Sequence, residues 1–215
     1  MYKINPLWYS AEPAEGFFSQ RLDLNIDIHY QKRYRWYVFK HIPQRRVMID
    51  VGANIGIFAR PAAHVFEKVI CFEPVEKNFV VLEKNMQGLH NVELHNLGLS
   101  DRAQRAKFEL KTLKCGQSQQ VEEWSQDPEF EPYECDLITL DSFGLEQVDW
   151  IKVDVEGYEM QVLEGGRETI RRNRPWLLLE RNGQDHVHGE WLNDLCGPYQ
   201  AAPVKSKTNT IWIPQ

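Results

Sequence analysis

Acidic residues follow several short apolar runs in this 215-residue chain, and acids are poor strand formers unless they have a specific role there. Asp50 lies near the end of VMIDV, and Glu73 closes the run KVICF. Asp154 follows VDWIKV, and Glu180 closes WLLLE. Carboxylates in these places can bind hydroxyl or ammonium groups of a ligand, or take up a proton during a reaction.

The loop after the first of these runs, GANIG at residues 52–56, is typical of a close approach between backbone and ligand. It lacks the third glycine of the dinucleotide fingerprint, and Asp50 would repel a pyrophosphate but attract an ammonium group. Glu73 follows 23 residues after Asp50 and can accept hydrogen bonds from both hydroxyls of a ribose. Together these features favour a nucleoside with a cationic or zwitterionic tail, which S-adenosylmethionine fits better than NAD.

The elements that must position these residues alternate between strands and helices. The apolar patterns predict strands at residues 47–51, 68–74, 91–101, 106–110, 135–140, 148–155 and 176–180, and helices at 55–66, 75–86 and 159–173. Pro61 predicts that the first of these helices is kinked or starts late. This order indicates an open, mostly parallel sheet covered on both faces, with its ligand site beyond the carboxyl ends of the strands.

Composition and charge narrow the class of protein. The chain is 42% hydrophobic, has no run of 18 apolar residues, and carries a formal net charge of −6, which argues against general nucleic-acid binding. It begins without a signal-peptide pattern, and its four cysteines are widely spaced without zinc-site spacing. We therefore expect a cytoplasmic protein with reduced thiols and no bound metal.

The chain divides into an N-terminal extension at 1–45 and a main domain at 46–215. The extension is expected to be helical, with a basic, aromatic segment packed at the sheet edge or acting as a substrate gate through Tyr30, Arg33 or Tyr34. Residues 111–135 are strongly acidic and are expected to form a mobile, lid-like insertion that sets acceptor specificity.

Several motifs in series resemble one known family. The segments VMIDVGANIGIF, VICFEPVEKNFVVLEKN, NVELHNLGLSD, ITLDSF, VDWIKVDVEGYEMQVLEGG and RPWLLLE follow one another as in the FkbM family of S-adenosylmethionine-dependent methyltransferases. The resemblance covers roughly residues 46–182. It implies a Rossmann-like class I methyltransferase fold with a seven-stranded, mostly parallel sheet, helices on both faces and a C-terminal antiparallel hairpin.

The resemblance also implies roles for individual positions. The methionine part of the cofactor would lie against Asp50, Gly52, Ala53, Asn54 and Gly56, and the ribose against Glu73. The adenine would lie beside Pro74, Val75, Leu99, Ser100 and Asp101, and Asp154 would face the sulfonium.

The sequence contains fewer specific motifs for binding the methyl acceptor than for binding the cofactor. The sequence has DVEG after the fourth main strand, where amino-methylating enzymes of this fold often have a proline-proline-aromatic motif, so transfer to oxygen is favoured. Asp154 and Glu156, two residues apart, are expected to share a face, and either can be the base that removes the hydroxyl proton. Together with Glu180 they are also a minority candidate for a metal site. The same rim is expected to include Asn182, with His186 and His188 in the loop that follows.

The leading hypothesis is an O-methyltransferase acting on a hydroxyl of a small-molecule or saccharide acceptor. An RNA ribose 2'-O-methyltransferase is the alternative, with Lys152 as the candidate lysine beside the base. A non-catalytic nucleoside-binding module remains open as well, whereas an NAD-dependent oxidoreductase is disfavoured by the missing third glycine.

Overall fold

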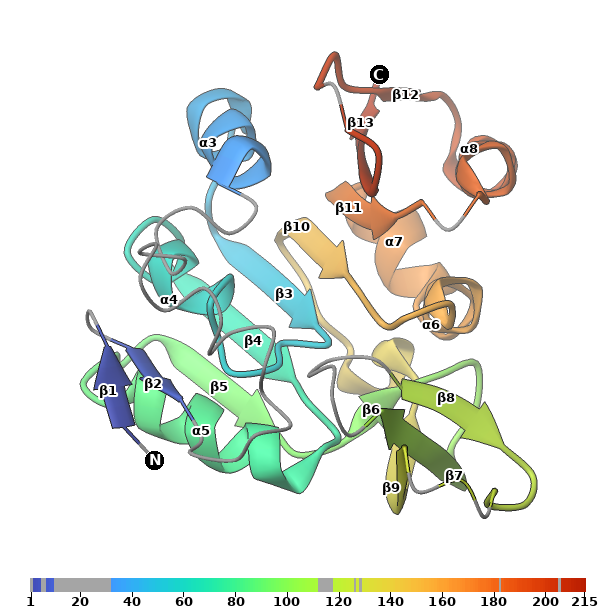
Figure 1. Cartoon of the computed structure of the whole chain (residues 1–215). Helices are drawn as coiled ribbons and strands as arrows, with labels where there is room; N and C mark the ends of the chain where they lie inside the picture. Colours follow the sequence, from blue (N-terminus) through green and yellow to red (C-terminus); the bar gives the residue numbers. More distant parts are fainter. Residues whose placement is uncertain are drawn as a thin grey trace.

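The computed structural model describes residues 2–4, 7–9, 32–111, 118–125, 127, 129–181, 183–204 and 206–215. Its centre is a seven-stranded sheet with the strand order β12-β13-β11-β10-β3-β4-β5 (Figure 1). The parallel strands are β3 (Val47–Val51), β4 (Lys68–Phe72), β5 (Val92–His95), β10 (Val148–Val153) and β11 (Trp176–Glu180). At one edge β12 (Tyr199–Ala201) and β13 (Asn209–Pro214) form an antiparallel pair, which confirms the predicted fold class and C-terminal hairpin.

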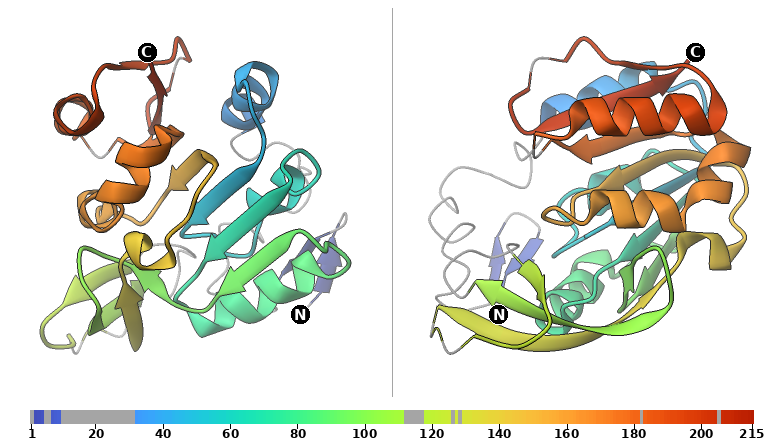
Figure 2. Two further views of the ribbon diagram at one scale, coloured as in Figure 1. Left: turned by 180° about the vertical axis from the view of Figure 1, so that it is seen from behind. Right: turned by 90° about the vertical axis from the view of Figure 1, so that its right-hand side faces the viewer.

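Helices cover both faces of this sheet, as the run of fully buried strand residues requires. One face carries α3 (Lys32–His41), α4 (Ala59–Ala62) and α5 (Glu76–Met86), and the other carries α6 (Glu159–Gly165), α7 (Arg167–Asn173) and α8 (Asp185–Cys196) (Figures 1 and 2). Neighbouring strand residues point to opposite faces: Met48 and Trp150 belong to the first core, and Ile49 and Ile151 to the second.

The N-terminal extension contains the predicted helix, because its basic, aromatic segment forms α3, and it differs from the prediction in two ways. The antiparallel strands β1 (Tyr2–Ile4) and β2 (Leu7–Tyr9) precede that helix and were not predicted. The helix α3 lies on a face of the sheet, not at its edge, because Tyr34 and Val38 join the core around Trp150. Arg35 anchors it further, since its Nη1 donates to the carbonyl of Ile57 at 2.7 Å. Tyr30 lies outside the described residues.

A second, four-stranded sheet replaces two predicted features. The expected strand at 91–101 ends at His95, and the chain then leaves the main sheet to form β6 (Gly98–Leu99). The order of the second sheet is β6-β9-β7-β8, with β7 at Gln104–Lys111, β8 at Ser118–Val121 and β9 at Phe130–Ile138. The region expected to be a mobile loop therefore contributes β8 and most of β9 to a paired sheet. The strand patterns alternate, so one face can pack while the other meets water.

Two predicted helices are interrupted for identifiable reasons. The helix expected at 159–173 breaks between α6 and α7, at Gly165 and Gly166. A Cβ atom on Gly165 would lie 1.9 Å from the carbonyl oxygen of Ser100, so only glycine allows this contact. The helix after the glycine loop begins late, at Ala59, and contains Pro61, as predicted.

The described part of the chain contains no helix with both the length and the apolar composition that a membrane span requires.

Candidate active site

A pocket that is partly open to solvent lies at the carboxyl ends of β3, β4 and β10. This is where the sequence placed the ligand site, because ligands of open parallel sheets bind beyond the strand ends. The strands of the main sheet and the segments that follow them contribute Val51, Gly52, Asn54, Phe72, Glu73, Pro74, Val75, Asn78, Asp154, Val155, Glu156 and Tyr158 to its lining, and the second sheet contributes Gly98, Leu99, Phe108, Leu110, Tyr133 and Leu137.

The glycines of the loop after β3 have different roles. Gly52 has φ +72°, and a Cβ there would lie 2.1 Å from the carbonyl oxygen of Asp154, so glycine allows the ends of β3 and β10 to approach. Gly56 has φ +84° and does not line the pocket, since its Cα packs against the Met86 side chain of α5. Ala53 is also buried outside the lining. Of these, only Gly52 is exposed to a ligand.

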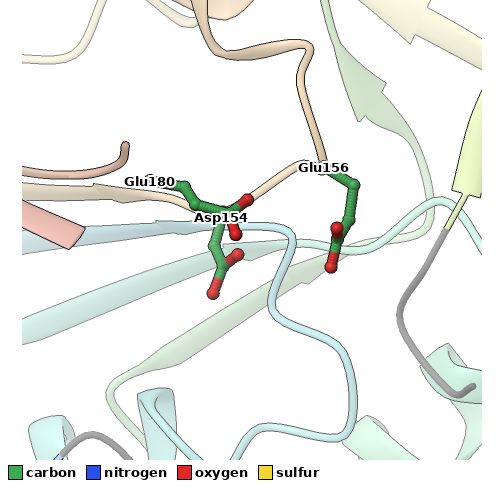
Figure 3. A group of neighbouring side chains, drawn as sticks. All are labelled: Asp154, Glu156 and Glu180. Carbon is green, nitrogen blue, oxygen red and sulfur yellow. The ribbon is translucent and has the colours of Figure 1, made fainter. Parts of the chain in front are cut away.

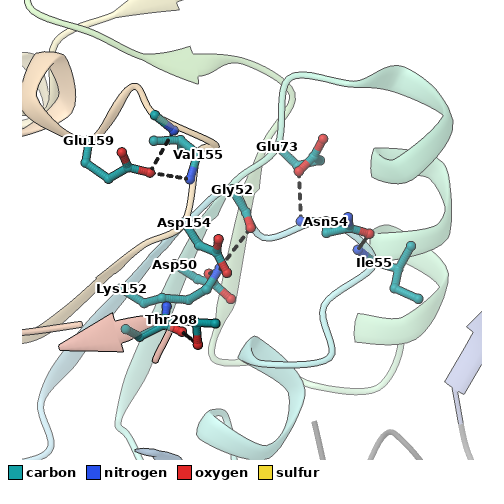
Figure 4. Close-up of polar contacts among 12 residues, drawn as sticks. Asp50, Gly52, Asn54, Ile55, Glu73, Lys152, Asp154, Val155, Glu159 and Thr208 are labelled. Atoms are coloured by element: carbon teal, nitrogen blue, oxygen red, sulfur yellow. Dashed lines mark hydrogen bonds and ion pairs between the residues drawn. The ribbon is translucent and has the colours of Figure 1, made fainter. Parts of the chain in front are cut away.

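Asp50 is fully buried and is not part of the pocket lining. Its Oδ1 accepts a hydrogen bond of 2.9 Å from the Nζ of Lys152, which also donates to the carbonyl of Gly52 at 2.9 Å (Figure 4). Burial raises the pKa of Asp50, and the Lys152 ammonium opposes that rise. The expected direct attraction between Asp50 and a ligand ammonium is therefore replaced by an internal ion pair that holds the loop.

Glu73 lines the pocket at the end of β4, as expected, and its carboxylate also organises the loop. Its Oε2 accepts from the backbone amide of Asn54 at 2.8 Å, and its Oε1 accepts from the amide of Val75 at 3.0 Å and from Asn78 Nδ2 at 3.3 Å. Burial raises the pKa of Glu73, while these donors oppose the rise. Asn54 has φ 51°, a left-handed conformation that asparagine tolerates better than most residues.

Three carboxylates converge at the edge of the pocket, which we call its mouth; two of them, Asp154 and Glu156, line the pocket. Asp154, Glu156 and Glu180 each have an oxygen within 4.8 Å of the other two (Figure 3). The prediction that these acids share one rim is thereby confirmed. The sequence around these three acids does not have the tight ligand spacing of a structural metal site. That the protein binds no metal stays a prediction.

Glu156 reaches this group through a turn, not through the strand geometry that the sequence suggested. Strand β10 ends at Val153, and Glu156 has φ 54°. The turn is held by Glu159, whose Oε1 accepts from the backbone amides of Val155 at 3.3 Å and Gly157 at 3.1 Å (Figure 4). A non-glycine residue in the left-handed region is uncommon, and such residues concentrate at functional sites.

The environment of Glu156 favours its protonated form. The residue is exposed at the mouth, but its carboxyl is turned towards the other two acids. Partial burial of this carboxyl, followed by repulsion from Glu180 and Asp154, raises its pKa to about 8. Lys152 lies on the other side of Asp154, with 3.8 Å between Nζ and Asp154 Oδ2.

Other predicted site residues lie apart from the pocket. Leu99 lines it, but Ser100 is fully buried and Asp101 is exposed, with neither in the lining. His186 and His188 are on α8 and not in a loop; His186 is exposed and His188 is buried. Asn182 lies outside the described residues.

Sequence reasoning missed the aromatic side of the pocket. Phe108 and Tyr133 reach it from β7 and β9, and Tyr158 reaches it from the turn before α6. The alternation of polar and apolar residues in QRAKFELK and FEPYECDLI is the signal that could have placed the first two on one face.

Comparisons with known proteins agree with this architecture. The family model described as "Methyltransferase FkbM domain" matches residues 50–197. The 2-O-methyltransferase NoeI of Sinorhizobium fredii is 28% identical over 170 residues, which are 67% of this chain and 66% of NoeI. The chain thus spans slightly less than two thirds of that relative.

Among solved structures, methyltransferase FkbM from Methylobacillus flagellatus superimposes with a TM-score of 0.56 at 18% identity, over 92% of this chain and 55% of that one. SMU.1697c from Streptococcus mutans, a putative methyltransferase solved in complex with SAH, has a TM-score of 0.54 at 9% identity, over 85% and 96% of the two chains. At these identities the likeness shows the fold alone.

Proposed function

Because this chain belongs to the FkbM methyltransferase family, we propose that it transfers a methyl group from S-adenosylmethionine to a hydroxyl group of a small, polyhydroxylated acceptor. The observation that carries the proposal is the placement of Glu73 and Asp154 at the ends of β4 and β10, the two parallel strands that flank β3, where both residues line one pocket. The family match makes the enzyme a methyltransferase, and the cofactor and acceptor class are our inference from the site.

The residues of the pocket fit an adenosyl cofactor. Glu73 can accept from ribose hydroxyls on the side of its carboxylate that faces the pocket, beside an apolar surface formed by Pro74 and Leu99. At the other end, Gly52 leaves backbone exposed and Asp154 offers a negative charge. S-adenosylmethionine, when bound, supplies an electrophilic methyl group, so the protein must position an acceptor and take up its proton.

We assign that proton transfer to Glu156. With a pKa of about 8, its carboxylate is a stronger base than an ordinary glutamate and is available near physiological pH. Asp154 has an oxygen within 4.8 Å of Glu156 and an oxygen 3.8 Å from the Nζ of Lys152, and its carboxylate is the group that we place closest to the sulfonium. Lys152 and Asp50 are positioning residues, because they hold the loop and strand end and stay out of the lining.

The charge at the mouth supports a neutral hydroxyl acceptor over RNA. Carboxylates accept hydrogen bonds from sugar-type hydroxyls, whereas three acids within 4.8 Å would repel a phosphate backbone. The candidate lysine for an RNA enzyme, Lys152, is 4% exposed and bonded to Asp50. The printed name of NoeI, a 2-O-methyltransferase, supports transfer to oxygen.

The proposal is tested by isothermal titration with S-adenosylhomocysteine, followed by methyl transfer from radiolabelled S-adenosylmethionine to a panel of saccharides and to RNA. We expect S-adenosylhomocysteine to bind and to raise the melting temperature, and a saccharide to be labelled with or without EDTA. Stabilisation by NAD but not by S-adenosylhomocysteine would overturn the cofactor assignment. Labelling of RNA in preference to every saccharide would overturn the acceptor class. Asp154→Asn that retains full turnover would remove Asp154 from the mechanism.

A further inference from the structure

The second sheet presents a pair of aromatic rings to the pocket. Phe108 of β7 and Tyr133 of β9 point to the same side of the sheet, because residues directly opposite each other in an antiparallel pair share a face. They are direct cross-strand partners, and their rings stack with centroids 5.4 Å apart and planes 27° apart. Both rings line the pocket. A cross-strand aromatic pair therefore forms a ready-made surface for a flat ligand.

A third ring from the main domain extends this surface. Tyr158 also lines the pocket and contacts Phe108 edge-on, with centroids 6.3 Å apart and planes 74° apart. Its hydroxyl lies 3.5 Å from the Oγ of Ser100, at the point where the chain leaves β6. We call Phe108, Tyr133 and Tyr158 the aromatic wall. It combines two residues of the second sheet with one from the turn before α6, so its shape depends on the inserted sheet being docked.

The aromatic wall lies close to the residues that follow Glu73. Tyr133 lines two hollows of the surface together with Pro74 and Val75, which come directly after Glu73 in the chain. Leu99 of β6 adds to the apolar lining of the pocket. This apolar lining suits a thin ring system attached to the group that Glu73 holds.

We propose that the inserted sheet is part of the cofactor site and that the adenine ring stacks on its aromatic wall. This inference rests on the proposed function, since it takes the nucleoside to be that of S-adenosylmethionine. It assigns the insertion a role different from the acceptor-specific lid that the sequence suggested. Stacking on aromatic side chains suits a purine, because each base has an extended π face and makes few demands on charge.

The experiment measures the dissociation constant of S-adenosylhomocysteine for variants of Tyr133, which is less deeply buried than Phe108. Tyr133→Ala should weaken binding about tenfold, which corresponds to about 1.4 kcal/mol and lies within the range for stacking one base. Tyr133→Phe keeps the ring and should stay within about twofold of the wild type. Trp124→Ala is the matched control, because Trp124 is an exposed aromatic residue of the same insertion outside the pocket lining.

The possible outcomes separate this inference from the proposed function. If the wild type does not bind S-adenosylhomocysteine, both fail. If the wild type binds it and Tyr133→Ala binds equally well, only the aromatic wall is wrong. A raised KM for the acceptor with an unchanged cofactor affinity would assign the wall to the acceptor instead. Should Tyr133→Ala lose its native circular dichroism, Tyr133→Leu, which preserves apolar volume, is measured against Tyr133→Phe by the same criterion.

Discussion

Two groups of charged residues lie within the same site and are built in opposite ways. Beneath the glycine loop, Asp50 is paired with Lys152, and Glu73 accepts three hydrogen bonds from the chain around it. At the mouth, Asp154, Glu156 and Glu180 bring three negative groups within 4.8 Å of one another. The first group compensates its charges within the fold, and the second concentrates them.

The difference indicates which group supports the structure and which performs the chemistry. A buried charge must have a partner, because the desolvation cost is otherwise several kcal/mol. At the mouth, partial burial and repulsion from Glu180 and Asp154 raise the pKa of Glu156, which costs stability but provides a base near neutral pH. We therefore expect changes to the buried group to unfold the protein, and changes at the mouth to affect turnover with the fold intact.

The largest expected effect is on stability. Lys152→Met removes the partner of the fully buried Asp50, whose Oδ2 already has no hydrogen-bond partner among the described residues. We expect a loss of about 3–5 kcal/mol in the free energy of unfolding, measured by urea denaturation. Lys77→Met is the control, since Lys77 pairs with Glu131 on the surface and should cost less than about 1 kcal/mol. Equal losses in the two variants would contradict the comparison.

Glu156→Gln tests whether the acids at the mouth affect turnover and leave stability unchanged. The substitution removes the proposed base and relieves repulsion, so turnover should fall about a hundredfold or more while the free energy of unfolding is unchanged or slightly higher. Initial rates and urea denaturation measure the two effects. Glu83→Gln, on the exposed surface of α5, is the matched control and should leave both unchanged. A variant with normal turnover would exclude Glu156 as the base.

The pH dependence sharpens the same assignment. The pKa of Glu156 is raised to about 8, and the proposed base acts in its deprotonated form. The wild-type kcat/KM should therefore rise about tenfold per pH unit below 8 and level off above it. Any residual activity of Glu156→Gln should lack this rise. A wild-type profile that is flat between pH 6 and 9 would rule out this assignment.

The smallest effect concerns a buried group outside both clusters. The ring nitrogens of His188 have no hydrogen-bond partner among the described residues, and burial lowers the pKa of His188. The folded state thus favours the neutral ring, so its contribution to stability is complete above about pH 6.5 and is lost as pH falls below that value.

When the pH is lowered from 7.5 to 5.5, the free energy of unfolding of the wild type should therefore fall by about 1 kcal/mol more than that of His188→Leu. His186→Leu, on the exposed side of the same helix, should show little such change. A His188→Leu difference that does not depend on pH would show that the ring is not held neutral.

The main sheet could be predicted because its strands are apolar in sequence. All six residues of β10 are buried, and such a run is recognisable without its neighbours. The second sheet was missed as a unit because its strands alternate and pair with distant segments. The break at Gly165 depends on the position of Ser100, 65 residues earlier, which no local pattern reveals.

The site was predictable to a similar extent. Glu73 and Asp154 follow strands directly, so their convergence followed from the fold. The pairing of Asp50 with Lys152 was not predicted, because the two residues are 102 positions apart in the chain and a buried ion pair has no local signature. The position of Glu156 depends on a left-handed turn that Glu159 maintains. Strand geometry predicted correctly that Glu156 lies near Asp154, but the turn, and not a shared strand face, brings them together.

The way the second sheet is attached has a consequence for how this enzyme can diversify. Leu99 pairs with Ile138, and the amide of Ser100 donates to the carbonyl of Ile138 at 2.9 Å, so the chain enters and leaves the sheet at neighbouring points. The segment from 102 to 136 is thus an insertion whose two ends lie close together. It can be lengthened, shortened or exchanged without rerouting the seven-stranded sheet, which makes it the natural place for grafting one relative's insertion onto another.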